Sequence, residues 1–74
     1  IRFALESRSP VDLVIVDVQG RLVRSLLRDE LGAGTHEVAW DGRAESGESV
    51  GTGMYFMVLR HSRGVESRKV LRVP

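Results

Sequence analysis

The chain has no cysteine, only two prolines and only four aromatic side chains among its 74 residues. Without cysteine, neither a disulfide framework nor a thiolate metal site is available, so an apolar core has to stabilise the fold. A chain of this length buries only about 60% of the surface that it exposes when unfolded. Because so little interior remains for a catalytic pocket, we expect one small domain over residues 1–74 and no enzyme.

Long apolar runs are lacking as well. The longest, residues 54–59, has six residues, whereas a membrane-spanning helix needs roughly 18 or more. We therefore expect no membrane insertion. The chain also starts at Ile1, without a methionine, and enters an alternating apolar pattern at once. This start predicts a piece from the end or the middle of a longer protein.

The chain has no large excess of positive or negative charge either. The net charge is +1, and ten arginines and one lysine are interleaved with ten acidic residues. A nucleic-acid-binding domain typically combines a basic patch with aromatic side chains that stack on bases. The composition therefore predicts no nucleic-acid partner.

The sequence does contain several short runs of alternating or β-branched apolar residues. The strands that these runs predict are 1–5, 11–18, 36–40, 54–60 and 65–73, with a very short one near 49–50. Turn residues separate the runs: 7–10 is expected to be a loop, and Gly20 can take the positive φ that closes a hairpin. About seven short strands with this spacing predict an all-β fold, a β-sandwich.

The segment 21–31 is ambiguous. Leu22, Val23, Leu26, Leu27 and Leu31 recur at helical spacing, so their periodicity favours an amphipathic helix. As a strand, 22–27 would be apolar on both faces. The residues alone leave both structures open.

Five short motifs follow one another along nearly the whole chain. They are Ile1-x-Phe3, Val11-x-Leu13-x-Ile15-Val16-Asp17-Val18-x-Gly20-Arg21-x-Val23, Gly34-x-His36-x-Val38-x-Trp40-Asp41-Gly42, Gly53-x-Tyr55-Phe56 and Arg68-Lys69-Val70. In this order they resemble the FlgD-type immunoglobulin-like family, which overlaps with the C-terminal sorting domains of type IX secretion. The resemblance implies an immunoglobulin-like or fibronectin-like β-sandwich, and it implies that 22–27 is a strand.

The motif residues have physical roles as well, and we expect these roles to be structural. Trp40 is predicted to bury its indole in the centre of the core, and Asp41 before Gly42 favours an Asx turn. Gly53 would allow a close backbone approach, while the Tyr55 hydroxyl would reach a loop backbone.

Three further motif residues lie in the first hairpin and near the C-terminal end. Asp17 and Arg21 flank the Gly20 turn, so they belong to the same structural set. Lys69, the single lysine, has two interpretations. The resemblance implies a lysine of the sorting motif, whereas its position on a strand predicts an exposed residue that discourages edge pairing.

No catalytic, cofactor-binding or metal-binding residue is expected. His36 and His61 have no Gly-x-Ser-x-Gly nucleophile motif or ligand spacing beside them. Calcium binding by Asp41, Glu45 and Glu48 is an alternative, but this loop lacks the alternating acidic spacing of known calcium loops.

One pattern predicts an interaction surface. If the alternate residues of two buried strands face the core, the residues between them form an apolar outer face. The expected face consists of Val14, Val16, Met54, Phe56 and Val58. Such a patch usually marks a contact with another protein surface.

Together with these observations, the family resemblance implies a non-catalytic C-terminal sorting or anchoring module of a secreted or cell-surface bacterial protein. Its partners would be proteins: the rest of the parent chain, the secretion machinery or neighbouring subunits. The alternative is a retained structural module, either a spacer in an extracellular enzyme or a subunit contact in a flagellar hook cap or surface filament.

Overall fold

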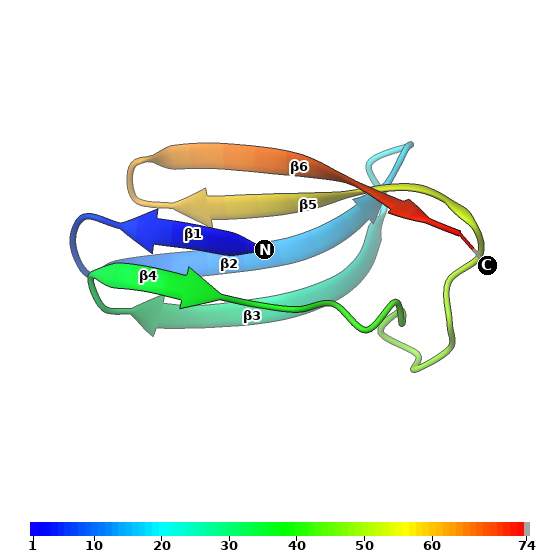
Figure 1. Ribbon diagram of the computed structural model, residues 1–74, viewed down its shortest axis with the longest axis horizontal. Helices are drawn as coiled ribbons and strands as arrows, with labels where there is room; N and C mark the ends of the chain where they lie inside the picture. Colours follow the sequence, from blue (N-terminus) through cyan, green and yellow to red (C-terminus); the bar gives the residue numbers. More distant parts are fainter. Residues whose placement is uncertain (74) are drawn as a thin grey trace.

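The computed structural model of the chain describes residues 1–73, which form six antiparallel β-strands in two sheets (Figure 1). The strands are β1 (Arg2–Leu5), β2 (Ser9–Asp17), β3 (Leu22–Leu31), β4 (Gly34–Glu37), β5 (Gly53–His61) and β6 (Gly64–Arg72). Over these residues we find no helix of the length and apolarity that a membrane crossing requires.

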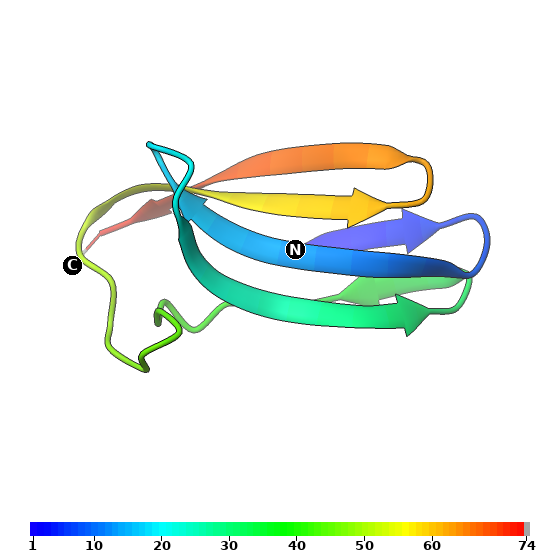
Figure 2. The same cartoon turned by 180° about the vertical axis from the view of Figure 1, so that it is seen from behind.

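The two sheets differ in size. One has four strands in the order β3-β2-β5-β6, and the other pairs β1 with β4. The small sheet lies over one side of the large sheet, as the front and back views show (Figures 1 and 2). The prediction of an all-β, immunoglobulin-like sandwich is confirmed, with six strands instead of about seven. The expected strand near 49–50 is reduced to an isolated bridge between Arg43 and Ser49.

The core lies between the two sheets and is built by alternation. Phe3 and Leu5 of β1 face Leu13 and Ile15 of β2, both of which have no exposed surface, and Leu59 of β5 is only 1% exposed. Each of these strands points every second side chain inward, which is the period of a pleated strand. The alternating pattern of the sequence therefore located the core on β1, β2 and β5.

The strand β2 begins earlier than predicted. Ser9 and Pro10 were expected in a loop, yet both belong to β2, and Ser9 is only 2% exposed. Its hydroxyl accepts a hydrogen bond from the backbone N–H of Ser62 at 2.9 Å and donates one to the Pro10 carbonyl at 2.8 Å. Because this contact satisfies a buried polar group, a turn-forming residue can occupy the start of a core strand.

The ambiguous segment 21–31 forms the strand β3, as the family resemblance implied. Its register against β2 shifts twice, leaving Leu26 and Val23 without a partner. Each such β-bulge adds one residue to the strand and resets the face of the side chains that follow. Val23, Leu26, Leu27 and Leu31 can therefore all pack against the core. The two bulges produce the spacing that favoured a helix.

The strand β4 ends earlier than expected. The prediction placed a strand at 36–40, but β4 ends at Glu37, and Trp40 lies outside it. Val38 still exchanges two backbone hydrogen bonds with Ile1, whose N-terminal ammonium donates to the Val38 carbonyl. The chain therefore leaves the small sheet gradually, and the loop that follows determines the position of the Trp40 side chain.

Truncating a fully buried side chain should reveal how much the single core contributes. We expect Leu59→Ala to lower the free energy of unfolding by about 2–5 kcal/mol, because it removes apolar contacts and leaves a cavity. Urea unfolding followed by Trp40 fluorescence measures this loss. Leu71→Ala is the matched control, since Leu71 is 65% exposed and its truncation should change stability by less than about 0.5 kcal/mol. Equal losses for both variants would contradict this location of the core.

Candidate interaction surface

Within residues 1–73, no other strand lies over one face of the large sheet, because the small sheet lies over only the opposite face. Val11, Leu13 and Ile15 of β2 are buried, so the residues between them point to the opposite side. We call this side the outer face. Its apolar residues are Val14, Val16, Leu22, Met54, Phe56, Val58, Val65 and Leu71.

The strand register brings these apolar side chains together. Val16 lies opposite Leu22 on β3 and opposite Phe56 on β5, and Val14 lies opposite Val58. Directly opposite residues on one face are near enough for their side chains to touch. All five residues of the expected face therefore lie on the outer face, and their role in binding stays a prediction.

Sequence reasoning missed three members of the outer face, Leu22, Val65 and Leu71. Leu22 is 60% exposed and Leu71, which lies opposite Met54, is 65% exposed. The helical spacing of 21–31 grouped Leu22 with the apolar side of a possible helix, and only the β3 bulges place it on the outer face. The alternation of β6 could have identified Leu71, since it shares the outer position of Lys69 two residues earlier.

A groove crosses the outer face and has charged residues at one end. It has a volume of about 380 Å³ and an apolar lining of Val14, Val16, Leu22 and Val58. At the charged end, Asp12 lies between Arg28 on β3 and Arg60 on β5. The groove can therefore accept an apolar side chain of a partner, with polar groups at its border.

The hairpin between β2 and β3 is closed by Asp17. Its Oδ1 accepts the backbone N–H groups of Gln19 and Arg21, each at 2.9 Å, and its Oδ2 accepts Arg21 Nε at 3.1 Å. Gly20 has a φ of 82°, a conformation that favours glycine. The motif residues Asp17, Gly20 and Arg21 therefore form one turn at the apolar end of the outer face.

Trp40 marks the end of the core and not its centre, so that part of the prediction is wrong. The indole is half-buried, and its Nε1–H donates to the Arg43 carbonyl at 2.9 Å. The Tyr55 ring meets it edge-on at 5.6 Å, and the Arg72 guanidinium lies 5.6 Å from the ring centre. An indole needs a partner for its N–H, which the loop provides at the rim.

The motif glycines Gly42 and Gly53 differ in the space that surrounds them. Gly42 has a φ of 79°, and a Cβ there would collide with the Arg72 guanidinium. Gly53 was expected to allow a close backbone approach, but no atom lies within 4 Å of the position that its Cβ would take. Its φ of 151° explains the glycine instead.

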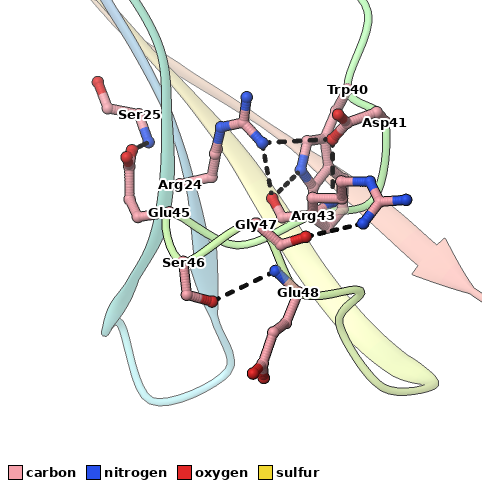
Figure 3. Close-up of polar contacts among 9 residues, drawn as sticks. All are labelled: Arg24, Ser25, Trp40, Asp41, Arg43, Glu45, Ser46, Gly47 and Glu48. Atoms are coloured by element: carbon pink, nitrogen blue, oxygen red, sulfur yellow. Dashed lines mark hydrogen bonds and ion pairs between the residues drawn. The ribbon is translucent and has the colours of Figure 1, made fainter.

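The loop between β4 and β5 docks on the edge of β3 (Figure 3). The Glu45 N–H donates to the Val23 carbonyl at 3.0 Å, and the Glu45 carboxylate accepts the N–H of Ser25. The Arg24 guanidinium lies 3.4 Å from Asp41 Oδ1. These contacts satisfy the backbone of β3 beside the bulge, so the loop covers this part of the edge.

Two of the three acidic side chains of this loop, those of Asp41 and Glu45, contact the protein itself. Asp41 Oδ1 accepts the N–H of Arg43 at 3.0 Å, which is the expected Asx turn, and Glu45 is bound to β3. No group of three potential metal ligands occurs within residues 1–73. The Tyr55 hydroxyl donates to the Gly51 carbonyl at 2.9 Å, so the predicted contact with a loop backbone is present.

The histidines and Lys69 lie apart from one another. A ring nitrogen of His36, Nε2, is 2.7 Å from the Gly32 carbonyl, and His61 Nε2 is 3.3 Å from the Glu66 carboxylate. Lys69 is exposed on β6, opposite Phe56. Among the described residues, neither histidine ring is hydrogen-bonded to a serine or threonine hydroxyl.

The Asp17 turn gives stability a dependence on pH. The backbone hydrogen bond from Arg21 is the main cause that lowers the pKa of Asp17 below its ordinary value of 3.8, while partial desolvation opposes it and the Gln19 bond assists. A carboxyl group with a lowered folded-state pKa stabilises the fold above its unfolded pKa, and this contribution is lost as the pH falls through the folded pKa.

We expect Asp17→Asn to lower the urea midpoint at pH 7, because the amide loses the charge that its donors favour. Its deficit relative to wild type should shrink as the pH falls below about 4. Urea unfolding between pH 7 and pH 2 measures the deficit at neutral pH and its change with pH. Glu48→Gln is the matched control, since the Glu48 carboxylate makes no ion pair within residues 1–73. A deficit that stays constant with pH would contradict the role of Asp17.

Comparison with known proteins connects this fold to a family. The model of the FlgD Ig-like domain matches residues 1–64. Two proteins named basal-body rod modification protein FlgD, from Salmonella typhimurium and Salmonella typhi, are each 40% identical over 65 residues. The match covers 84% of this chain but 28% of each relative, so the chain spans little more than a quarter of their length. No solved structure gives a significant match. With a family match over most of its residues, the chain belongs to the FlgD Ig-like domain family.

Proposed function

We propose that this chain is a non-catalytic structural module of a flagellar assembly protein and that it binds protein partners through the outer face. The observation that carries the proposal is the 40% identity to basal-body rod modification proteins. The partners of the whole protein are part of the proposal, because the match covers only 28% of each relative.

The outer face supports the proposal physically. Phe56 and Val16 lie side by side on it, and Leu22 and Leu71 keep most of their surface exposed. Burying an apolar side chain of this size contributes about 1.5–3 kcal/mol. A few such residues in one contiguous patch are enough to hold a partner, which is why large exposed apolar patches usually mark contacts.

A retained module is favoured over a sorting signal. The family match and the relatives concern FlgD and carry no sign of type IX sorting, so the overlap that the motifs suggested has no support from them. Export to the bacterial cell surface fits both interpretations. The proposed module stays in the assembled structure, whereas a sorting signal is removed.

Replacing an apolar residue of the outer face with a charged residue tests the proposed contact. We expect Phe56→Asp, in a strain that carries the variant in place of the wild type, to keep normal protein levels and to abolish swimming, because a carboxylate cannot be buried against an apolar partner. Thr35→Asp places the same charge on β4, at an exposed position, and should leave swimming unchanged. Normal swimming with Phe56→Asp would refute the contact, and circular dichroism showing an unfolded Phe56→Asp domain would mean that Phe56 is a core residue.

Mass spectrometry distinguishes the retained module from a cleaved signal. Trypsin releases residues 44–60 as one peptide, because the next basic residue after Arg43 is Arg60. We expect this peptide in the protein recovered from the cell surface, at the same stoichiometry as peptides from the rest of the parent chain. Its absence there, together with its presence in cell extracts, would show that the domain is removed on export.

A further inference from the structure

Positive charge concentrates at one edge of the large sheet. Residues 60–72 carry five cationic side chains and one acidic side chain, whereas residues 1–59 carry six cationic and nine acidic side chains. Over residues 1–73, Arg63 is the one member of the cationic group that forms an ion pair with a carboxylate, that of Glu6. The interleaving of charges over the whole chain hides this local excess.

Three of these cations, Arg68, Lys69 and Arg72, lie on β6, whose open side we call the basic edge, while Arg60 lies on β5 and Arg63 in the turn between the two strands. The strand β6 lies at the end of the order β3-β2-β5-β6, and it is the most exposed strand of the sheet. A two-residue turn makes His61 and Gly64 the hydrogen-bonded pair that closes the β5–β6 hairpin. The N–H and C=O groups of alternate residues therefore point away from β5. These residues are Val65, Ser67, Lys69 and Leu71.

We propose that the open edge of β6 binds an extended acidic segment of a protein partner, which adds a fifth strand to the large sheet. This inference rests on the proposed interaction function and names the chemistry of the partner. Backbone hydrogen bonds to an exposed sheet edge hold such segments, and side chains on alternate positions select them. Charge complementarity selects the acidic segment here.

The alternation of β6 defines the pattern of the partner. Arg68 and Arg72 lie opposite Met57 and Gly53, on the side that faces the small sheet. Val65 and Leu71 point to the outer face and are 62% and 65% exposed. A partner strand with acidic residues toward Arg68 and apolar residues toward Val65 and Leu71 matches most of both sides, and Lys69 on the outer side offers a contact to one further acidic residue.

The same features argue against a second copy of the chain as the partner. Pairing β6 with β6 would bring together two strands that each carry three cationic side chains and one acidic side chain, and the repulsion between strands of like net charge opposes such pairing. At β3, the other edge of the sheet, the Glu45 loop already binds Val23 and Ser25. Basic residues on an edge strand also discourage self-association. If the basic residues of β6 served that purpose alone, no peptide would bind to the edge.

The test measures the binding of two matched peptides to the full chain by fluorescence polarisation. The probe is a ten-residue peptide of alternating Glu and Val, and the control is its Lys and Val counterpart. We expect the Glu–Val peptide to bind at least tenfold more tightly, and its affinity to fall with added salt because the charges are exposed. Hydrogen exchange should show that the peptide protects the amides of Ser67 and Lys69.

Two pairs of variants separate a strand-like contact from simple charge attraction. Ser67→Pro removes an N–H that points to the open edge, where proline is tolerated, and should abolish binding, whereas Ser67→Ala should bind as the wild type does. Arg68→Glu combined with Lys69→Glu should reverse the preference to the Lys–Val peptide. Arg2→Glu, on the small sheet, should leave it unchanged.

Three results would overturn the inference: equal affinity for both peptides, unchanged binding by Ser67→Pro, or protection of β3 amides in place of β6 amides. Tighter binding to anionic phospholipid vesicles or to an oligonucleotide, unaffected by Ser67→Pro, would show a general basic surface instead. The proposed function is judged separately. If Phe56→Asp abolishes swimming while the peptide fails to bind, the outer face is a contact and the β6 edge is not.

Discussion

The structure depends on one constraint: the small sheet has only two strands, so it can cover only one face of the four-stranded sheet. The core is the single contact between them, and Leu13, Ile15 and Leu59 lie at its centre. A chain of 74 residues has too little apolar surface to build a second such layer. The apolar outer face follows from this, and so does its availability to a partner.

The bulges of β3 connect the sheet to the loop that follows β4. An added residue leaves part of the strand backbone without its usual partners, and Glu45 binds that backbone on both sides of Arg24. The same loop satisfies the Trp40 indole through the Arg43 carbonyl. The loop therefore closes one end of the core and covers one sheet edge, while the outer face and β6 stay free.

The sequence predicted the parts of the fold in which one physical rule acts alone. Strict alternation located β1, β2, β5 and the five expected residues of the outer face, because a pleated strand repeats every two residues. The same rule failed at β3, where two bulges change the alternation and imitate a helix. Ser9 was misplaced because its hydrogen-bond partner comes from the distant β5–β6 turn, and Trp40 was misplaced because the irregular loop that follows it binds the indole at the rim of the core. The basic edge is visible only when charges are counted for one hairpin.

The outer face and the open edge of β6 are neighbours, and this arrangement makes them act together. Leu71 belongs to the outer face, and its backbone groups point to the open edge. A strand added at that edge would continue the outer face by one strand, with its apolar side chains beside Val65 and Leu71. A partner that contacts both regions would bury more apolar surface while its backbone is satisfied by β6. Since backbone pairing at a sheet edge gives affinity and the neighbouring side chains select the segment, the two surfaces together would give this small module both strength and specificity.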